Sequence, residues 1–160
     1  MRIGIVSDTH NHLRNVERIV GLFNAARVDR VIHTGDITQA KTLNVFARLD
    51  APLYGVFGNN DQEREALEDA IARHGFHFVD PPLRLAWHDR QIVVVHDPLD
   101  LGPVLDGHDL ALHGHTHQRR IERTPSGLVF NPGECAGHLS GYNAVGVVHL
   151  ATLTPELLHF

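Results

Sequence analysis

The chain has 160 residues, of which 42% are hydrophobic and 21% charged, and a formal net charge of −5 at pH 7. This length fits a single domain over residues 1–160 with a sizeable core, and the acidic balance argues against nucleic-acid binding by charge. The chain has a single cysteine, Cys135, which excludes an internal disulfide. It has no run of 18 apolar residues, so we expect no membrane span. The opening MRIGIVSDTHNH lacks a long apolar stretch, so we expect no signal peptide and a cytoplasmic protein.

The first half of the chain alternates strands with helices. Short apolar runs such as RIGIV predict buried strands, and apolar side chains at helical spacing, as at Val16, Ile19 and Phe23, predict helices. Gly75 is the expected C-terminal stop of the third helix. In chain order we expect strands within 2–6, 30–36 and 52–61 and helices within 12–26, 40–49 and 62–75.

The second half of the chain is rich in strands. LRLAWH and QIVVVH flank the pair Asp89-Arg90 and predict a β-hairpin. The pattern predicts an α/β fold in which helices cover one sheet and a second sheet packs against it. Further short strands are expected within 110–117, 118–123, 128–133, 143–150 and 156–160.

Polar side chains follow five of the predicted strands. The segments IVSDTH, VIHTGD, GVFGNN, VVVHD and LALHGHTH are each an apolar run that ends abruptly in Asp, Asn or His. Ligands of parallel α/β sheets bind just beyond the carboxyl ends of the strands, so we expect these side chains to meet at one edge. The chain also has 14 histidines, as many as its lysines and arginines together, and three of them lie within ALHGHTHQ.

Seven of these side chains form a candidate ligand set for metal ions. One carboxylate can bridge two cations, and His115 and His117 would point to the same side of an extended segment. Nitrogen and oxygen donors together suit Mn²⁺, Fe²⁺, Ni²⁺, Co²⁺ or Zn²⁺. The set lacks the thiolates of a structural zinc site and has too many nitrogen donors for a calcium site. Seven ligands exceed the need of one tetrahedral ion and fit two. The set is Asp8, His10, Asp36, Asn59, His96, His115 and His117.

Each motif alone also has a structural explanation. Asp8 is of a type that caps helices, Gly58 and Asn59 suit a plain turn, and His96 fits a buried histidine with a satisfied hydrogen bond. A coincidence of five such motifs in one short chain favours the metal site.

The ordered series D-T-H, G-D, G-N-x-D, H and G-H-T-H resembles the calcineurin-like metallophosphoesterase superfamily. VIHTGDI and NPGE resemble its small single-domain prokaryotic phosphodiesterase branch, and the match runs from Ser7 to Gly133. The resemblance implies a four-layer αββα sandwich with two mixed sheets. It also implies a dinuclear phosphoesterase in which a hydroxide shared by the two metals attacks the phosphate ester in line.

The resemblance further assigns the ligands to two metal ions. Asp8, His10 and His117 would hold one ion. Asn59, His96 and His115 would hold the other, and Asp36 would bridge both. Asp36, Asn59 and His115 are the residues expected to serve catalysis. Mn²⁺ is the first expectation for the two ions, ahead of Ni²⁺, Fe²⁺, Co²⁺ and Zn²⁺.

The chain departs from the family pattern after Asn59. Many relatives carry a histidine there that protonates the leaving oxygen, whereas this chain has Asn60, which cannot act as a general acid near neutral pH. We therefore expect a preference for diesters with acidic alcohols over unactivated monoesters. Asp61 is interpreted as the cap of the following helix.

The candidates for contact with the substrate or with the ligands are His12, Asn60, Asp61, Asp97 and His138. His12 and His138 are placed to compensate for the missing histidine, although an exposed position at a helix start and a loop position are the favoured interpretations. Asp97 replaces a common glycine and either tunes a ligand or adds charge at the rim. His113 has no standard ligand role and is interpreted as structural or as a support for a ligand.

The leading hypothesis is therefore a metal-dependent phosphoric ester hydrolase, more a phosphodiesterase than a monoesterase. The alternative is a catalytically weak metal-binding scaffold or assembly subunit on the same fold. A His-rich storage protein would not need the carboxylate and asparagine positions. The expected partner is a small phosphate ester, with nucleic acid only as a substrate, no membrane, and a monomer or homodimer.

Overall fold

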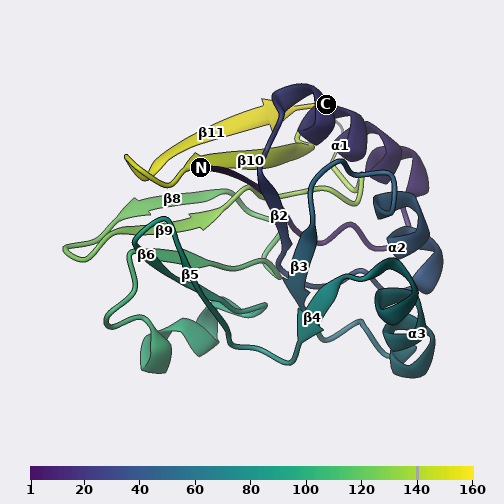
Figure 1. Cartoon of the computed structure of the whole chain (residues 1–160), viewed down its shortest axis with the longest axis horizontal. Coiled ribbons are helices and arrows are strands. Elements are labelled where there is room, and N and C mark those ends of the chain that lie inside the picture. The colour runs from purple at the N-terminus through teal and green to yellow at the C-terminus, as the bar shows by residue number, and fades with distance from the viewer. Residues whose placement is uncertain (140) are drawn as a thin grey trace.

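Two mixed β-sheets pack face to face, and three helices cover the outer face of the first sheet (Figure 1). The structure is a computed structural model, and it describes residues 1–139 and 141–160. The helices are α1 (Leu13–Ala26), α2 (Ala40–Phe46) and α3 (Arg64–His74), with a 3₁₀ helix η1 (Pro98–Val104). No helix in these described residues is long and apolar enough to span a membrane.

The first sheet has the strand order β11-β10-β1-β2-β3-β4. Its strands β1 to β4 run parallel, and β10 and β11 extend it in antiparallel fashion from β1. Helices connect the parallel strands, as the alternating pattern of the sequence predicted. The strands are β1 (Arg2–Val6), β2 (Arg30–His33), β3 (Leu53–Val56), β4 (His77–Val79), β10 (Ala144–His149) and β11 (Thr154–His159).

The second sheet has the strand order β5-β6-β7-β9-β8. The expected hairpin is its β5–β6 pair, while β6, β7 and β9 lie parallel to one another. The expected α/β fold with two mixed sheets is confirmed. The strands are β5 (Leu83–Trp87), β6 (Arg90–Val94), β7 (Leu110–Leu112), β8 (Arg120–Arg123) and β9 (Leu128–Asn131).

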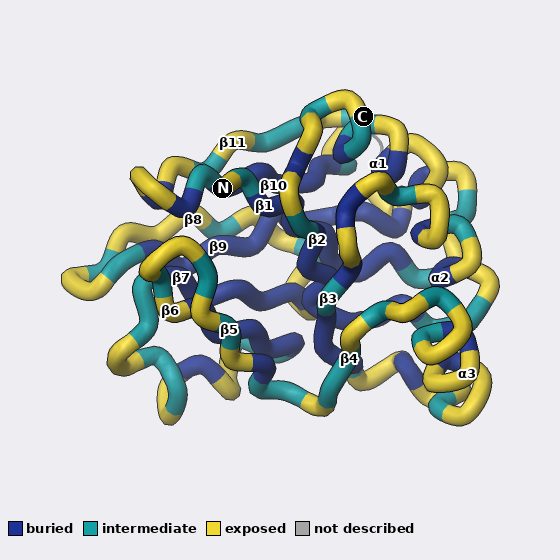
Figure 2. The backbone as a smooth tube through the Cα atoms, in the orientation of Figure 1, coloured by how far each residue is buried: buried dark blue, intermediate teal, exposed yellow. Residues whose placement is uncertain are grey.

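The cores follow from the alternation of side chains along the strands. Ile3 and Ile5 of β1 face the second sheet and pack with Ile92 and Phe130, whereas Val6 belongs to the core beneath the helices. A smaller cluster on the outer face of the second sheet includes residues of η1. Figure 2 shows the buried segments gathered in the central strands, with exposed segments at the periphery.

Two elements were not expected from the sequence. Strand β4 has only three residues at the edge of the first sheet, too few for a periodic signal. The acidic segment after His96 contains η1, which begins with the Asp97 side chain accepting a hydrogen bond from the Leu99 N–H at 2.9 Å. This cap fixes the chain immediately beside a candidate ligand.

Candidate metal centre

The seven predicted ligands lie beyond the carboxyl ends of five strands. Asp8 and His10 follow β1, Asp36 follows β2 and Asn59 follows β3, all in the parallel part of the first sheet. The remaining histidines follow β6 and β7 of the second sheet. Because both sheets end at the same place, side chains far apart in sequence meet there, and distances between their polar atoms of 3.0 to 3.8 Å connect the set.

One cluster of donor atoms consists of Asn59, His96, His115 and one oxygen of Asp36. The Asn59 Oδ1 lies 3.0 Å from His96 Nε2 and 3.1 Å from His115 Nδ1, and these two nitrogens are 3.3 Å apart. Asp36 Oδ1 lies 3.4 Å from His96 Nε2. Four potential ligand atoms from four loops thus face one another.

A second cluster consists of Asp8, His10, His117 and the other oxygen of Asp36. The Nε2 atoms of His10 and His117 are 3.4 Å apart, and His117 Nε2 lies 3.8 Å from Asp8 Oδ1. Asp36 Oδ2 lies 3.7 Å from His10 Nε2. Asp36 therefore turns one carboxylate oxygen toward each cluster.

The tautomers of two histidines direct lone pairs into these clusters. His96 Nδ1 lies 2.9 Å from the Thr34 carbonyl and donates to it, so a neutral His96 presents an acceptor at Nε2. His117 Nδ1 contacts the Glu134 carboxylate and leaves Nε2 as an acceptor in the same way. The His96 acceptor faces the carbonyl of Asn59 and the carboxylate of Asp36, and the His117 acceptor faces the carboxylate of Asp8; these oxygens are acceptors too. Such a set of converging lone pairs fits divalent cations, because a cation relieves the repulsion among them.

Burial and charge shift several pKa values in the centre. Burial raises the pKa of Asp8 above its usual value, because the carboxyl group is fully enclosed. Burial opposes ionisation of Asp36 as well, but hydrogen bonds from His96 and Asn60 bring its pKa well below the usual range. His96 is desolvated, yet the carboxylate of Asp36 raises its pKa to about 8. A metal ion binding at neutral pH would therefore displace a proton from His96.

The backbone at the ligands adopts an uncommon conformation. The φ angles of Asp8, His10, Asp36, His115 and His117 lie between 45° and 67°, in the left-handed region. The expectation of an extended segment at His115 and His117 is therefore wrong: β7 ends at Leu112, and the turn that follows directs the two rings to different clusters. Left-handed non-glycine residues concentrate at functional sites.

Two glycines allow the ligand loops to approach one another. A Cβ atom on Gly114 would lie 2.1 Å from Ser7 Oγ and 2.8 Å from Asp8 Oδ2. A Cβ atom on Gly58 would lie 2.2 Å from Asp36 Oδ1. Any larger residue at these positions would push the loops apart, so the glycines are required by the spacing of the ligands.

Asp61 does not cap α3, contrary to the sequence interpretation, since Glu63 occupies that position. Its buried carboxylate accepts hydrogen bonds at 2.6 to 3.0 Å from four backbone N–H groups, because the loop after β3 folds against the loop after β2. The donors belong to Asp36, Ile37, Thr38 and Gly58.

Asn60, which stands in place of the family's histidine, holds Asp36. Its backbone N–H donates to Asp36 Oδ1 at 2.9 Å and its side-chain amide donates to Oδ2 at 2.8 Å. Both oxygens of the bridging candidate are thereby oriented. Asn60 is a positioning residue in this geometry, and its amide has no acidic proton to give to a leaving group.

The sequence interpretation gave no role to Glu134, the last residue of NPGE. The side chain is 2% exposed and contacts His117 Nδ1, while its other oxygen accepts the His138 N–H at 2.9 Å. Hydrogen bonding to His117 lowers the pKa of Glu134 against the effect of burial. A carboxylate soon after a buried strand was the available signal, but the sequence does not show that its loop returns to His117.

The other candidates take up varied positions. His12 caps α1 by accepting the Asn15 N–H and, in the described part of the chain, forms no hydrogen bond or ion pair with the candidate ligands. The His138 ring stacks on the His117 ring with centroids 5.4 Å apart. Asp97 Oδ2 lies 3.9 Å from His115 Nε2, and the buried His113 donates to the Gly114 carbonyl.

His33 supports the centre from beneath the ligand loops. Its Nδ1 accepts the Gly35 N–H at 3.1 Å, so its Nε2 donates to Thr9 Oγ1 at 2.9 Å. This arrangement requires a neutral ring, and complete burial lowers the pKa of His33 to about 3.

The pKa of His33 predicts a loss of stability in mild acid. Below pH 6.5 His33 binds a proton in the unfolded chain but stays neutral in the folded protein. The contribution of His33 to the free energy of unfolding therefore falls by about 1.4 kcal/mol for each unit that the pH decreases. Urea unfolding of the metal-free protein and of His33→Asn at pH 7.5, 6 and 5 measures the difference. The stability of the wild type should fall more steeply than that of the variant, and parallel curves would contradict the assignment.

A family model supplies the decisive comparison, since residues 1–153 match the Calcineurin-like phosphoesterase superfamily domain. The chain belongs to the calcineurin-like phosphoesterase superfamily. It is 33% identical to Phosphodiesterase MJ0936 of Methanocaldococcus jannaschii over 153 residues, and this match covers 92% of each chain. It is 32% identical to a probable metallophosphoesterase of Methanothermobacter thermautotrophicus, over 83% of this chain and 76% of that one. A phosphoric ester hydrolase is thus confirmed at the level of the family.

Solved structures of a phosphodiesterase and a phosphoesterase share the fold. An archaeal phosphodiesterase superposes with a TM-score of 0.90 at 31% identity and covers 100% of both chains. The YfcE phosphoesterase of E. coli superposes with a TM-score of 0.74 at 20% identity, over 99% of this chain and 98% of that one. The expected resemblance to this superfamily is confirmed.

Proposed function

We propose that the chain is a phosphodiesterase that works with two divalent ions. The observation that carries the proposal is the convergence of acceptor atoms from five strand ends around Asp36. One oxygen of Asp36 faces one cluster, and the other oxygen faces the second cluster. The similarity to phosphodiesterases supports the diester as the substrate. When bound, two such ions lower the pKa of a water and neutralise charge on the phosphoryl oxygens during in-line displacement.

We assign each of the two clusters of ligands to one metal ion. Asp8, His10 and His117 would hold one ion. Asn59, His96 and His115 would hold the other, and Asp36 would contribute an oxygen to each.

The surrounding residues orient these ligands. The Thr34 carbonyl fixes the ring of His96, Glu134 fixes that of His117, and Asn60 holds both oxygens of Asp36. With Asn60 in place of a general acid, the enzyme favours diesters whose alcohols leave as stable anions. The nitrogen and oxygen donors suit Mn²⁺, Ni²⁺, Fe²⁺, Co²⁺ and Zn²⁺, and we propose Mn²⁺ as the first of these, in a cytoplasmic enzyme.

Hydrolysis of bis-p-nitrophenyl phosphate by metal-stripped protein tests the proposal, with Mn²⁺, Ni²⁺, Co²⁺, Zn²⁺ or Mg²⁺ added back. Turnover should require a metal and should exceed that of p-nitrophenyl phosphate, which has the same leaving group but is a monoester. Two bound ions without turnover of either ester would contradict the enzyme and favour the alternative of a metal-binding scaffold.

Glu134→Gln is expected to weaken metal binding by about tenfold, since an amide orients the His117 ring less firmly than a carboxylate does. Isothermal titration of the metal-free variant with Mn²⁺ measures the change. Glu65→Gln is the matched control, because Glu65 is exposed on α3. Equal affinities of wild type and Glu134→Gln would show that Glu134 does not serve the metal.

A further inference from the structure

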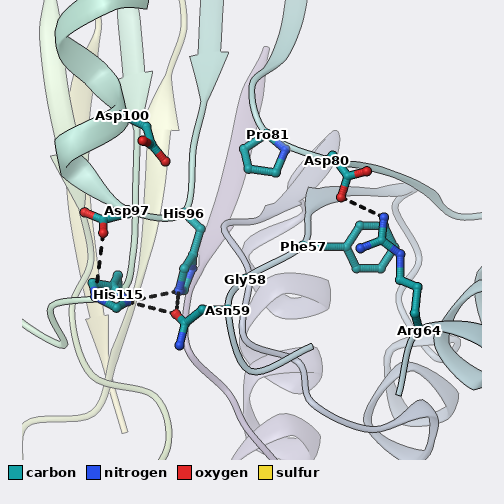
Figure 3. A pocket seen from close by; sticks show the side chains of 10 residues that line it. All are labelled: Phe57, Gly58, Asn59, Arg64, Asp80, Pro81, His96, Asp97, Asp100 and His115. Carbon is teal, nitrogen blue, oxygen red and sulfur yellow. Dashed lines mark hydrogen bonds and ion pairs between the residues drawn. The ribbon is translucent and has the colours of Figure 1, made fainter. Parts of the chain in front are cut away.

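A pocket of about 380 Å³ opens beside the candidate metal centre, and we call it the side pocket. Asn59, His96 and His115 form the wall next to the centre, as Figure 3 shows. The volume lies within the range of cavities that bind small organic molecules. A group attached to a phosphorus atom held at these ligands would have room in the side pocket.

The opposite wall of the side pocket is formed by a guanidinium that stacks on an aromatic ring and is paired with two carboxylates. The Arg64 guanidinium lies over the Phe57 ring, 3.4 Å from its centroid (Figure 3). It also pairs with Asp80 at 2.7 Å and with Glu68 at 2.9 Å. Because two carboxylates already neutralise this guanidinium, it offers no free positive charge to an anionic group.

Two further carboxylates line the side pocket from the η1 segment. Asp97 is fixed by the Leu99 N–H, and its other oxygen lies 3.9 Å from His115 Nε2. Asp100 is exposed on η1. Within residues 1–139 and 141–160 neither carboxylate pairs with a lysine or an arginine, so the η1 side of the pocket carries net negative charge.

Room for a second organic group exists elsewhere at the centre. A cavity of about 200 Å³ is bordered by His117 and Glu134 and includes the exposed side chains of Leu139 and Tyr142. A phosphodiester has two organic groups, and two cavities border the candidate ligands. One group can therefore occupy each cavity while the phosphoryl group stays at the centre.

We propose that the side pocket binds one organic group of the phosphodiester and selects neutral or cationic groups over anionic ones. The inference rests on the proposed phosphodiesterase function and names its substrate class. The walls accept an uncharged or positively charged alcohol, whereas an alcohol with a carboxylate or a further phosphate meets the carboxylates of Asp97 and Asp100, which no lysine or arginine of the described residues neutralises. Like charges at such short range disfavour binding.

Three p-nitrophenyl phosphodiesters test this selection with one leaving group. Their second alcohols are choline, ethanol and 3-hydroxypropanoate, which are cationic, neutral and anionic. With Mn²⁺ present, and after division by the uncatalysed rates, kcat/KM for the choline ester should exceed that for the anionic ester roughly tenfold. The ethyl ester should lie between them.

Substitution of Asp100 links the selection to the pocket. Asp100→Asn should reduce the ratio of choline to anionic ester about threefold, and Asp100→Lys should reduce it further. Asp50→Asn is the matched control, because Asp50 is exposed and precedes β3, at the opposite end of that strand from Asn59. This control should keep the wild-type ratio.

The possible results separate the inference from the proposed function. Equal kcat/KM for the three esters, or an Asp100 variant that keeps the wild-type ratio, would overturn the inference and leave the phosphodiesterase intact. The same holds if Asp50→Asn changes the ratio as much as Asp100→Asn does. Failure to hydrolyse any of the three esters with any metal would overturn the proposed function and this inference with it.

Discussion

Asp36→Asn is expected to lower metal-dependent kcat/KM for bis-p-nitrophenyl phosphate by roughly a thousandfold. The substitution keeps the size of the side chain but replaces one ligand oxygen with an amide NH₂ group and removes the negative charge. Since the two oxygens of Asp36 face different clusters, a single change affects both. Steady-state kinetics at saturating Mn²⁺ measures the loss, and metal titration should show fewer than two ions bound per chain.

Asp50→Asn is the control for this loss, because it makes the same chemical change at an exposed residue away from the centre. It should retain wild-type activity. Circular dichroism should confirm that both variants are folded. If Asp36→Asn keeps full turnover while it binds only one ion, the bridging role is wrong and one metal suffices.

Asp61→Ala is expected to lower the free energy of unfolding by about 4 kcal/mol. Four backbone N–H groups donate to this buried carboxylate, and the substitution leaves them without an acceptor. A loss of this size is a large share of the stability of a small protein. Urea unfolding of the metal-free protein at pH 7 measures it.

Asp69→Ala serves as the matched control, because Asp69 is exposed on α3 and the same truncation there should change stability by less than about 0.5 kcal/mol. Asp61→Asn should fall between the two, since an amide oxygen still accepts some of the hydrogen bonds. If Asp61→Ala unfolds at the wild-type urea concentration, the carboxylate does not hold the loop of Asp36.

The positions of the main elements follow from local patterns. Apolar spacing predicted α1 and α3, and Gly75 ends α3 in the left-handed conformation, as expected. The layers were predictable because parallel strands need helical connections and a second set of strands needs a face to bury. Strand β4 escaped prediction because its three residues become a strand only through pairing with β3.

The candidate ligands were predictable as a set, whereas their supports were not. Polar residues at strand ends identified the set because topology brings such ends together. Asp61 lies next to a helix, so a cap was the local expectation, yet its partners are 23 to 25 residues away along the chain at 36–38. Contacts across such separations depend on tertiary packing, and the same holds for Glu134 and His117.

The left-handed backbone at five candidate ligands has a consequence for metal exchange. These angles are held by hydrogen bonds within the protein, such as the backbone pair from His10 N–H to the Asp36 carbonyl at 2.9 Å. The cost of the unfavourable conformations is met during folding and not at the moment of binding. We therefore expect that one ion can replace another without rearrangement of the chain, and that the identity of the working metal follows the supply of ions around the protein.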